Sequence, residues 1–371
     1  MVIFILGGML LALASGLYWL TGRWLSLYGI PVKKWNIRLL RVGAVVAVAL
    51  LCWLWRMTLL IALHLMALFF LMDVGAFVIR RVGRKCREER WYRTFRSIYH
   101  SGLVPVCITC LLLGFGAYQI RNIVPTEYTI STDKVQANYR VILLTDLHYD
   151  TIQNRNVLKN KIDEINAWNP DLIVLGGDIV EEGTSKTSME EAFQVLGGLK
   201  STFGTYYVYG NHDRQDYADA ASGARTYTVQ ELQDAIESNG ITILCDRWVP
   251  VGEELVLAGR NDVSTRDGRA AAKDLLKDAD RNRFIITADH QPVETKENAR
   301  LGVDLQLSGH THAGQIFPVG YFTDWFLEPN YGKYEMEGCT LIVSSGVAGW
   351  GFPARTQGKC EYVVIDIIPD K

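Results

Sequence analysis

Residues 140–148 have the sequence RVILLTDLH, an apolar run that stops at a polar cluster, and DLIVLGGD (171–178) and TYYVYGNHD (205–213) repeat this pattern. Segments with a helical spacing of apolar residues, 154–168 and 187–199, separate the three runs. Short apolar strands that alternate with helices are typical of an α/β fold with largely buried sheets. We therefore expect an α/β domain here.

The alternation continues toward the end of the chain. Further strands are expected at 241–244, 254–262, 284–290, 305–312, 339–346 and 361–368, and further helices at 228–238, near 269–279 and after Pro292. Residues 122–137 are interpreted as a linker and lead-in strand, which assigns 138–371 to the α/β domain. A domain of this length buries a substantial core.

The net charge of −2 conceals two different parts of the chain. Residues 1–121 hold 15 Lys and Arg against three acidic residues, a net charge of +12. The remaining 250 residues hold 23 basic and 37 acidic residues, a net charge of −14. This division excludes a single soluble domain.

The basic part has the composition of a membrane anchor. Residues 2–20 form an uncharged apolar run long enough to cross a hydrocarbon core of ~30 Å. Residues 42–79 are too long for one crossing and predict two helices that turn near residues 53–56, and 102–120 give a last span. Residues 1–121 are thus expected to form about four transmembrane helices.

Basic residues in the loops predict the orientation of these helices. Residues 21–41 carry five basic residues, and 80–96 carry eight against two acidic ones. The positive-inside rule places both segments in the cytoplasm and everything after Arg121 outside. The protein is therefore expected to be a multi-pass protein of the cell membrane with its α/β domain on the extracytoplasmic side. Asp73 either marks a functional site within a span or lies near the membrane interface.

Polar clusters follow the predicted strands, where ligands bind in open α/β sheets. All five histidines of the acidic part lie in these clusters. Seven residues are candidate metal ligands: Asp146, His148, Asp178, Asn211, His290, His310 and His312.

Imidazole, carboxylate and amide groups suit Mn, Fe or Zn. Seven ligands are too many for one ion and sufficient for two if a carboxylate bridges. Two ions ~3.5–4 Å apart clamp a phosphoryl oxygen and activate water. We expect two divalent metal ions, whose identity stays open.

The motifs TDLH, GGD, GNHD, DHQP and SGHTHAGQ resemble those of the calcineurin-like metallophosphoesterases over about residues 138–368. The resemblance implies a two-sheet α/β/β/α sandwich and a metal-dependent phosphoric ester hydrolase, here a membrane-anchored one. It implies that Asp146, His148, Asp178 and His312 hold one metal, and that Asp178, Asn211, His290 and His310 hold the other. It also implies that His212 steadies or protonates the leaving oxygen and that Asp213 orients its ring.

Other residues allow two interpretations. Asp262 is expected in a turn, and Arg355 either contacts a phosphate or packs at the surface. The segment after SGHTHAGQ holds seven aromatic residues: Phe317, Tyr321, Phe322, Trp325, Phe326, Tyr331 and Tyr334. They line a groove for an acyl or prenyl chain, enter the membrane interface, or pack on their own domain.

The leading hypothesis is a dinuclear-metal phosphoesterase or pyrophosphatase acting on a lipid-linked or cell-envelope phosphate. The expected partners are membrane lipids and this phosphorylated substrate. Alternatives are a nucleotide phosphodiesterase, a pyrophosphohydrolase of the UDP-diacylglucosamine type, and a metal-bound sensor that regulates the membrane helices. The substrate of the second alternative is cytoplasmic, which conflicts with the predicted topology. Nucleic-acid binding is not expected, because the α/β part is acidic and has no basic stripe.

Overall fold

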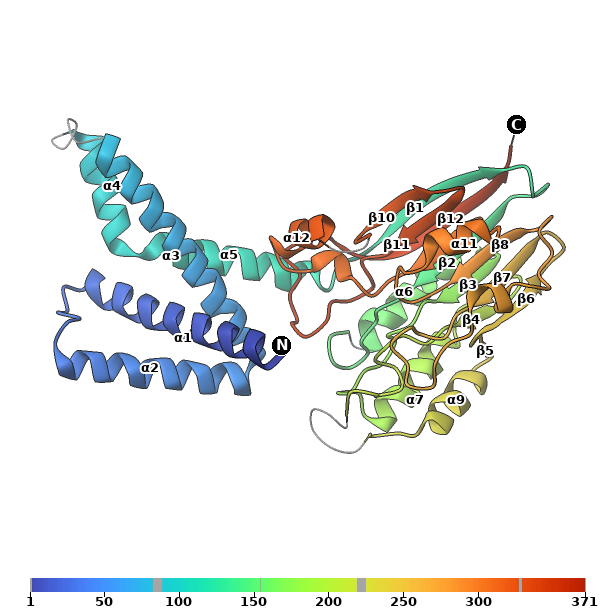
Figure 1. The fold of residues 1–371 in the computed structure, drawn as a ribbon, viewed down its shortest axis with the longest axis horizontal. Helices are drawn as coiled ribbons and strands as arrows, with labels where there is room; N and C mark the ends of the chain where they lie inside the picture. Colours follow the sequence, from blue (N-terminus) through green and yellow to red (C-terminus); the bar gives the residue numbers. More distant parts are fainter. Residues whose placement is uncertain (1, 83–88, 154, 219–224, 327–328, 371) are drawn as a thin grey trace. The chain divides into compact units, whose positions relative to one another are not determined.

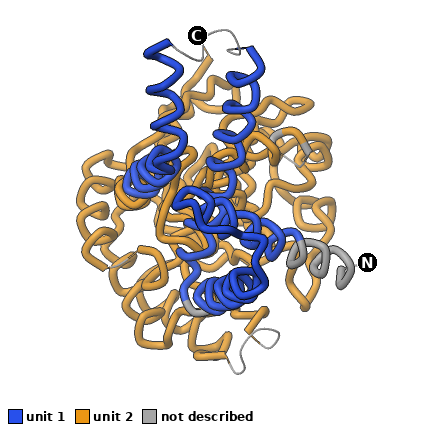
Figure 2. Tube along the Cα trace, turned by 90° about the vertical axis from the view of Figure 1, so that its left-hand side faces the viewer, with its two compact units in different colours: residues 1–115 blue, residues 116–371 orange. Residues whose placement is uncertain are grey.

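The fold was analysed in a computed structural model, which describes all residues except 1, 83–88, 154, 219–224, 327–328 and 371. The chain divides into two compact units, residues 1–115 and residues 116–371 (Figure 2). Each unit is described below by itself.

The first unit is helical (Figure 1). Its helices are α1 (Val2–Leu27), α2 (Trp35–Leu54), α3 (Arg56–Val82), α4 (Arg90–Ser101) and α5 (Leu103–Gln119), whose last turn belongs to the second unit. Helices α2 and α3 are separated at Trp55, which has an extended backbone with φ −143° and ψ 104°. The long apolar run therefore forms two helices that turn where the sequence predicted.

Fewer helices qualify as membrane spans than the sequence suggested. Within the described residues, 35–52 of α2 and all of α3 are long and apolar enough to cross a membrane. A third span exists only if α4 and α5, bent by 64°, count as one. Helix α5 has 17 residues, about 26 Å of helix, and α4 is rich in arginine. Two or three candidate spans are thus present among the described residues, where the sequence predicted about four. The side chains of residues 2–11, in the first predicted span, and the central basic residues of 80–96 lie outside the described residues.

Asp73 has partners within the first unit. Its carboxylate accepts hydrogen bonds from Arg23 Nε at 2.9 Å and from the Tyr99 hydroxyl at 2.8 Å. The Arg23 guanidinium also lies over the Tyr99 ring, 4.6 Å from its centroid. An acid paired in this way stabilises the contact between helices α1, α3 and α4. These contacts account for Asp73 without a functional site in the span.

The second unit contains two six-stranded mixed sheets. The first has the order β1 (Ile123–Thr132), β12 (Cys360–Pro369), β2 (Tyr139–Leu144), β3 (Leu172–Leu175), β4 (Thr205–Tyr207), β5 (Ile241–Ile243). The second has the order β10 (Gly332–Met336), β11 (Cys339–Val343), β9 (Leu305–Ser308), β8 (Phe284–Ala288), β7 (Leu255–Gly259), β6 (Arg247–Val251). Strands β2, β3, β4 and β5 run parallel, as do β7, β8, β9 and β11.

Helices cover the outer faces of both sheets. They are α6 (Arg155–Ala167), α7 (Lys186–Leu196), α9 (Val229–Glu237), α10 (Ala272–Leu275) and α11 (Thr295–Arg300). A short 3₁₀ turn, η2 (His312–Gly314), and helix α12 (Val319–Phe326) lie in the connection between β9 and β10. Helices α6, α7 and α9 pack on the first sheet, and α10 packs on the second. Residues of both inner sheet faces form a shared core. The expected two-sheet α/β/β/α architecture is therefore present.

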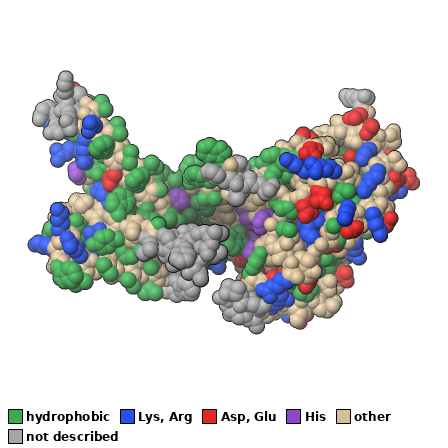
Figure 3. Space-filling model, viewed as in Figure 1, with side chains coloured by type: hydrophobic (Ala, Val, Ile, Leu, Met, Phe, Trp, Pro, Cys, Tyr) green, Lys and Arg blue, Asp and Glu red, His purple; other side chains and the backbone are tan. Residues whose placement is uncertain are grey.

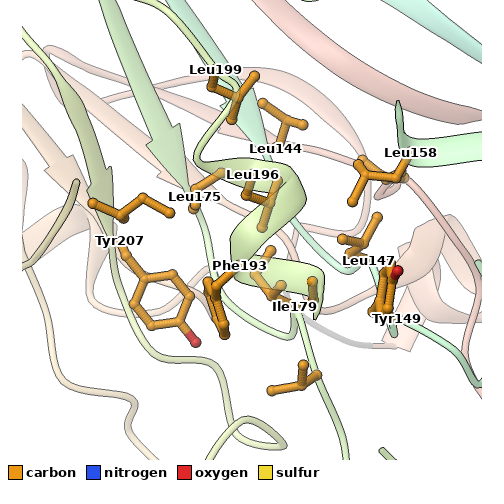
Figure 4. Packing of buried hydrophobic residues seen from close by; sticks show 14 of the residues in the cluster. Leu144, Leu147, Tyr149, Leu158, Leu175, Ile179, Phe193, Leu196, Leu199 and Tyr207 are labelled. Atoms are coloured by element: carbon orange, nitrogen blue, oxygen red, sulfur yellow. The ribbon is translucent and has the colours of Figure 1, made fainter. Parts of the chain in front are cut away.

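Strand β3 shows why the strands are apolar throughout. Ile173 and Leu175 pack among helices α6 and α7, whereas Leu172 and Val174 point into the core between the sheets. Figure 4 shows Leu175 beside Phe193 and Leu196 of α7 in the first of these clusters. Because successive strand residues face opposite sides, burial of both sides requires apolar residues at every position. The edge strands β6 and β10 are partly exposed and lack such a run, so the sequence analysis missed them.

Candidate metal centre

The candidate ligands lie just beyond the carboxyl ends of strands from both sheets. Asp146 and His148 follow β2, Asp178 follows β3, and Asn211 follows β4. In the second sheet His290 follows β8, and His310 and His312 follow β9. The carboxyl ends of parallel strands meet at one edge of a sheet. This topology brings side chains that are up to 166 residues apart in the sequence into one site.

One group of ligands consists of Asp146, His148 and His312. Each residue offers a ligand atom, and these atoms lie within 4.8 Å of one another. His312 Nε2 is 3.5 Å from Asp146 Oδ1. All three residues are buried. The group therefore has the composition and the closeness of a metal-binding set.

The second group consists of Asp178, His290 and His310, again with ligand atoms within 4.8 Å. His290 Nδ1 contacts the Gly176 carbonyl at 2.8 Å, so it carries the proton and donates it. His290 Nε2 is thereby left as an acceptor, 3.1 Å from Asp178 Oδ2. A histidine whose Nδ1–H is held by a carbonyl is pre-oriented for metal binding through Nε2.

Unpartnered buried atoms show that the two groups fit divalent cations. Among the described residues, His148 Nε2, His290 Nε2 and Asn211 Oδ1 are buried without a hydrogen-bond partner. Such groups destabilise a fold unless a ligand satisfies them. Ligands about 2.1 Å from a metal at right angles stand about 3.0 Å apart, close to the observed 3.1 Å between His290 and Asp178. The residues thus fit a dinuclear divalent metal site.

Five of the candidate ligands share an unfavourable left-handed backbone conformation. Asp146, His148, Asp178, His310 and His312 all have φ between 43° and 73°, a left-handed conformation that is unfavourable for residues other than glycine. Such residues are commonly found at functional sites. Glycines beside the ligands permit the close packing that results. A Cβ added at Gly346 would lie 2.6 Å from the Cβ of Asp146.

Backbone amides also hold the carboxylates. The His310 amide donates to Asp146 Oδ2 at 3.1 Å, and the His212 amide donates to Asp178 Oδ1 at 2.9 Å. Burial lowers the pKa of His312 to about 3. Ionised carboxylates and neutral histidines are the forms that bind metal.

Asp213 does not orient His212, which corrects the role implied by the resemblance. Its carboxylate accepts backbone amide hydrogen bonds from Gly210 and from residues 178–180, at 2.6 to 3.1 Å. His212 Nδ1 instead lies 2.7 Å from Glu182 Oε2. Burial lowers the pKa of His212, but the hydrogen bond with Glu182 and the Asp178 charge raise it to about 9. Asp213 therefore shapes the ligand loops, and Glu182 positions the His212 ring.

Two acidic residues of the site were missed in the sequence. Glu181 Oε2 is 3.1 Å from His148 Nδ1, and Glu182 holds His212 as described. They follow Asp178 by three and four residues, respectively. The pair of adjacent carboxylates after GGD was therefore the sequence signal that could have identified them. Aromatic rings flank His212 as well. Trp350 stacks on it with ring centroids 5.7 Å apart, and Tyr217 lies at 5.4 Å.

We expect Glu182→Ala to lower kcat for phosphoester hydrolysis about 10- to 100-fold and to leave KM within about twofold. The reason is that His212 loses the carboxylate that fixes its ring and its tautomer. Glu182→Gln keeps an acceptor oxygen and should restore part of kcat. Steady-state kinetics provide the measurement, with Glu190→Ala on helix α7 as the control. An unchanged kcat in Glu182→Ala would show that the pairing is unimportant.

The two remaining candidates have structural roles. Arg355 is fully buried, and its guanidinium donates to the carbonyls of His312, Ser345 and Ala348 at 2.7 to 2.8 Å. Neither expected role of Arg355, phosphate contact or surface packing, is present, because its guanidinium is bound to three carbonyls in the interior. Asp262 accepts the Ser264 amide at 2.8 Å, as expected of a turn residue, and also binds Gln291.

Comparisons with known proteins agree with this geometry. Residues 139–314 match the family model of the calcineurin-like phosphoesterases. An uncharacterized metallophosphoesterase of Helicobacter pylori strain J99 is 32% identical over 66% of this chain and 63% of its own length. The chain thus spans less than two thirds of that relative.

A second relative extends the similarity into the helical part. A transmembrane protein with metallophosphoesterase domain from Danio rerio is 26% identical over 90% of this chain and 80% of its own length. Together with the candidate membrane helices, this similarity supports membrane association. Residues 139–314 therefore contain a calcineurin-like phosphoesterase domain.

Proposed function

We propose that this protein is a dinuclear-metal phosphoesterase or pyrophosphatase that hydrolyses a lipid-linked or cell-envelope phosphate ester at a membrane. One observation carries the reaction class. Two groups of buried or half-buried histidines and carboxylates, with the ligand atoms of each group within 4.8 Å of one another, lie together with His212 beyond the strand ends. A structural role does not explain this many buried polar ligands, because their burial is costly without a cation.

Each residue has a distinct task in the proposed mechanism. Asp146, His148 and His312 hold one cation, and Asp178, His290 and His310 hold the other, with Asn211 supplying an amide oxygen. Bound divalent cations supply Lewis-acid stabilisation of charge on the phosphoryl oxygens and activate the attacking water. His212, held through Nδ1 by Glu182, directs Nε2 to the leaving oxygen and donates a proton to it.

The lipid-linked part of the proposal is supported by the organisation of the chain. Apolar helices precede the domain, and tethering to a bilayer raises the effective concentration of substrates in that bilayer. Trp350 and Tyr217 present partly exposed aromatic surface beside His212, suited to an apolar or planar group next to the phosphate. The loop charges further lead us to propose an extracytoplasmic domain. A C-terminal reporter active only outside the cytoplasm tests that side.

We expect chelation to abolish hydrolysis and added Mn²⁺ to raise the rate at least a hundredfold, because bound divalent cations would stabilise charge on the phosphoryl oxygens and activate the attacking water. The full chain in vesicles is assayed for phosphate or phosphomonoester release. The substrates are phosphatidic acid, an isoprenoid pyrophosphate, UDP-diacylglucosamine and a cyclic nucleotide. Preference for the cyclic nucleotide would contradict the lipid assignment. Retained metal without hydrolysis of any substrate would contradict the enzymatic assignment and favour a sensor.

A further inference from the structure

An exposed apolar patch lies on the second unit shortly after the last metal ligand. Of the nine large apolar side chains that are exposed among the unit's described residues, five lie between residues 317 and 325. These are Phe317, Val319, Tyr321, Phe322 and Trp325, and we call residues 317–325 the aromatic segment. Figure 3 shows hydrophobic side chains gathered over α12, which most of this segment forms. Contiguous exposed apolar patches mark interaction surfaces.

The aromatic segment is held by two residues of the stretch 355–357. The Thr356 hydroxyl accepts a hydrogen bond from the Phe317 amide at 3.0 Å. The Gln357 side chain accepts one from the Gly320 amide, also at 3.0 Å. Both contacts involve the backbone at the beginning of the segment, so its position on the domain is well defined while its side chains stay exposed.

Arg355 and Thr356 of the same stretch hold the end of the apolar helix α5. The Arg355 amide donates to the Gly116 carbonyl at 2.9 Å. Gly116 packs so closely that an added Cβ would lie 2.8 Å from Thr356 Cγ2. Residues 116–119 are the last turn of α5 and belong to the second unit. The aromatic segment and the point where the candidate membrane span enters the domain therefore share one support.

Gln315 connects this support to the metal centre. It is buried, three residues after the ligand His312. Its side chain accepts from the Trp350 amide at 2.8 Å and donates to the carbonyls of Phe352 and Ala354 at 3.0 and 2.9 Å. Trp350 in turn stacks on His212. A continuous set of contacts thus links the aromatic segment to the catalytic histidine.

We propose that the aromatic segment is an interfacial anchor that inserts into the headgroup region of the bilayer and holds the metal centre at the lipid surface. Tryptophan and tyrosine favour this region, and a short apolar helix lying in its plane buries one face. A bilayer is the chosen occupant because α5, with α4 a candidate span, is fixed to the same stretch. The anchor is independent of the proposed activity, whereas its consequence, access to phosphates at the lipid surface, rests on that function.

Photocrosslinking tests the anchor without relying on activity. The full chain carrying p-benzoylphenylalanine in place of Phe322 or Trp325 is reconstituted in vesicles of phosphatidylethanolamine and phosphatidylglycerol and irradiated. We expect lipid adducts at both positions, at least fivefold above those at Val263, an exposed residue elsewhere on the domain. Phe77 on helix α3 serves as the positive control. Adducts to a second copy of the chain, or lipid adducts no greater than at Val263, would overturn the proposal.

A matched pair of variants tests the consequence for substrate access. Val319 and Val263 are 45% and 44% exposed, so Val319→Asp and Val263→Asp introduce the same charge at equally accessible positions. We expect Val319→Asp combined with Trp325→Asp to raise KM for phosphatidic acid in vesicles at least tenfold. KM for soluble p-nitrophenyl phosphate should change less than twofold, and Val263→Asp should change neither. Equal effects on both substrates would contradict the anchor, whereas inactivity of the wild type on both would contradict only the proposed function.

Discussion

We expect Asp178→Asn to lower kcat/KM for phosphoester hydrolysis at least about 10³-fold, equivalent to about 4 kcal/mol of transition-state stabilisation. Asp178 is buried, with Oδ2 3.1 Å from His290 Nε2 and Oδ1 accepting the His212 amide. Asparagine has the same shape and keeps one oxygen for that amide. It lacks the negative charge, and its NH₂ group cannot coordinate a cation. The substitution therefore removes the metal ligand and retains the local packing.

Kinetics and metal content are measured together for this variant. Bound metal per chain, determined by mass spectrometry, should fall along with kcat/KM, while the melting temperature of the metal-free chain stays within a few degrees of the wild type. Asp366→Asn is the matched control, since Asp366 pairs with Arg140 at the opposite end of β2 from Asp146. We expect less than a twofold change there. Substantial activity in Asp178→Asn would refute a metal mechanism that depends on this carboxylate.

We expect Arg355→Met to destabilise the phosphoesterase domain by about 3 to 5 kcal/mol. The three carbonyls of His312, Ser345 and Ala348 lose their donors, and methionine offers no replacement. These carbonyls belong to the loop of a metal ligand and to the loop that leads to Trp350. The variant should therefore bind metal more weakly as well as unfold more easily.

Thermal unfolding of the full chain in detergent provides the measurement. A loss of this size corresponds to a decrease of about 10 °C in the Tm of the domain transition. Arg140→Met is the control, because Arg140 forms a partly exposed ion pair with Asp366 and such pairs contribute ~1 kcal/mol or less. If Arg355→Met and Arg140→Met shift Tm equally, the three carbonyl contacts do not have the proposed importance.

Short sequence patterns were sufficient to predict the α/β fold and the candidate metal ligands. Strands such as β3 are apolar at every position because both of their faces are covered, and each run ends at a polar cluster such as GGD or GNHD. The resemblance carried by these motifs implied that Asp146 and His312 hold the same metal, and the structure brings the two together although they follow strands of different sheets. The exposed edge strands carry no comparable pattern and were therefore missed.

Other features depend on contacts that no local pattern encodes. Glu182 rather than Asp213 holds the His212 ring, because the Asp213 carboxylate is occupied by backbone amides of the turn after β3. Arg355 was expected to contact a phosphate or to pack at the surface, yet its guanidinium binds interior carbonyls of its own loop and of His312, 43 residues away. Two or three candidate spans rather than four were found among the described residues, because α5 has only 17 residues and reaches the length of a span only together with α4.

By itself, the sequence determined the division into a basic helical part and an acidic α/β domain, the two-sheet fold and the metal-binding chemistry. These properties follow from composition, periodicity and short motifs, which are local in the chain. Only the tertiary structure decided which carboxylate holds His212 and that residues 355–357 support both the aromatic segment and the end of α5. Such contacts join residues far apart in the sequence, so their partners are defined only once the chain has folded.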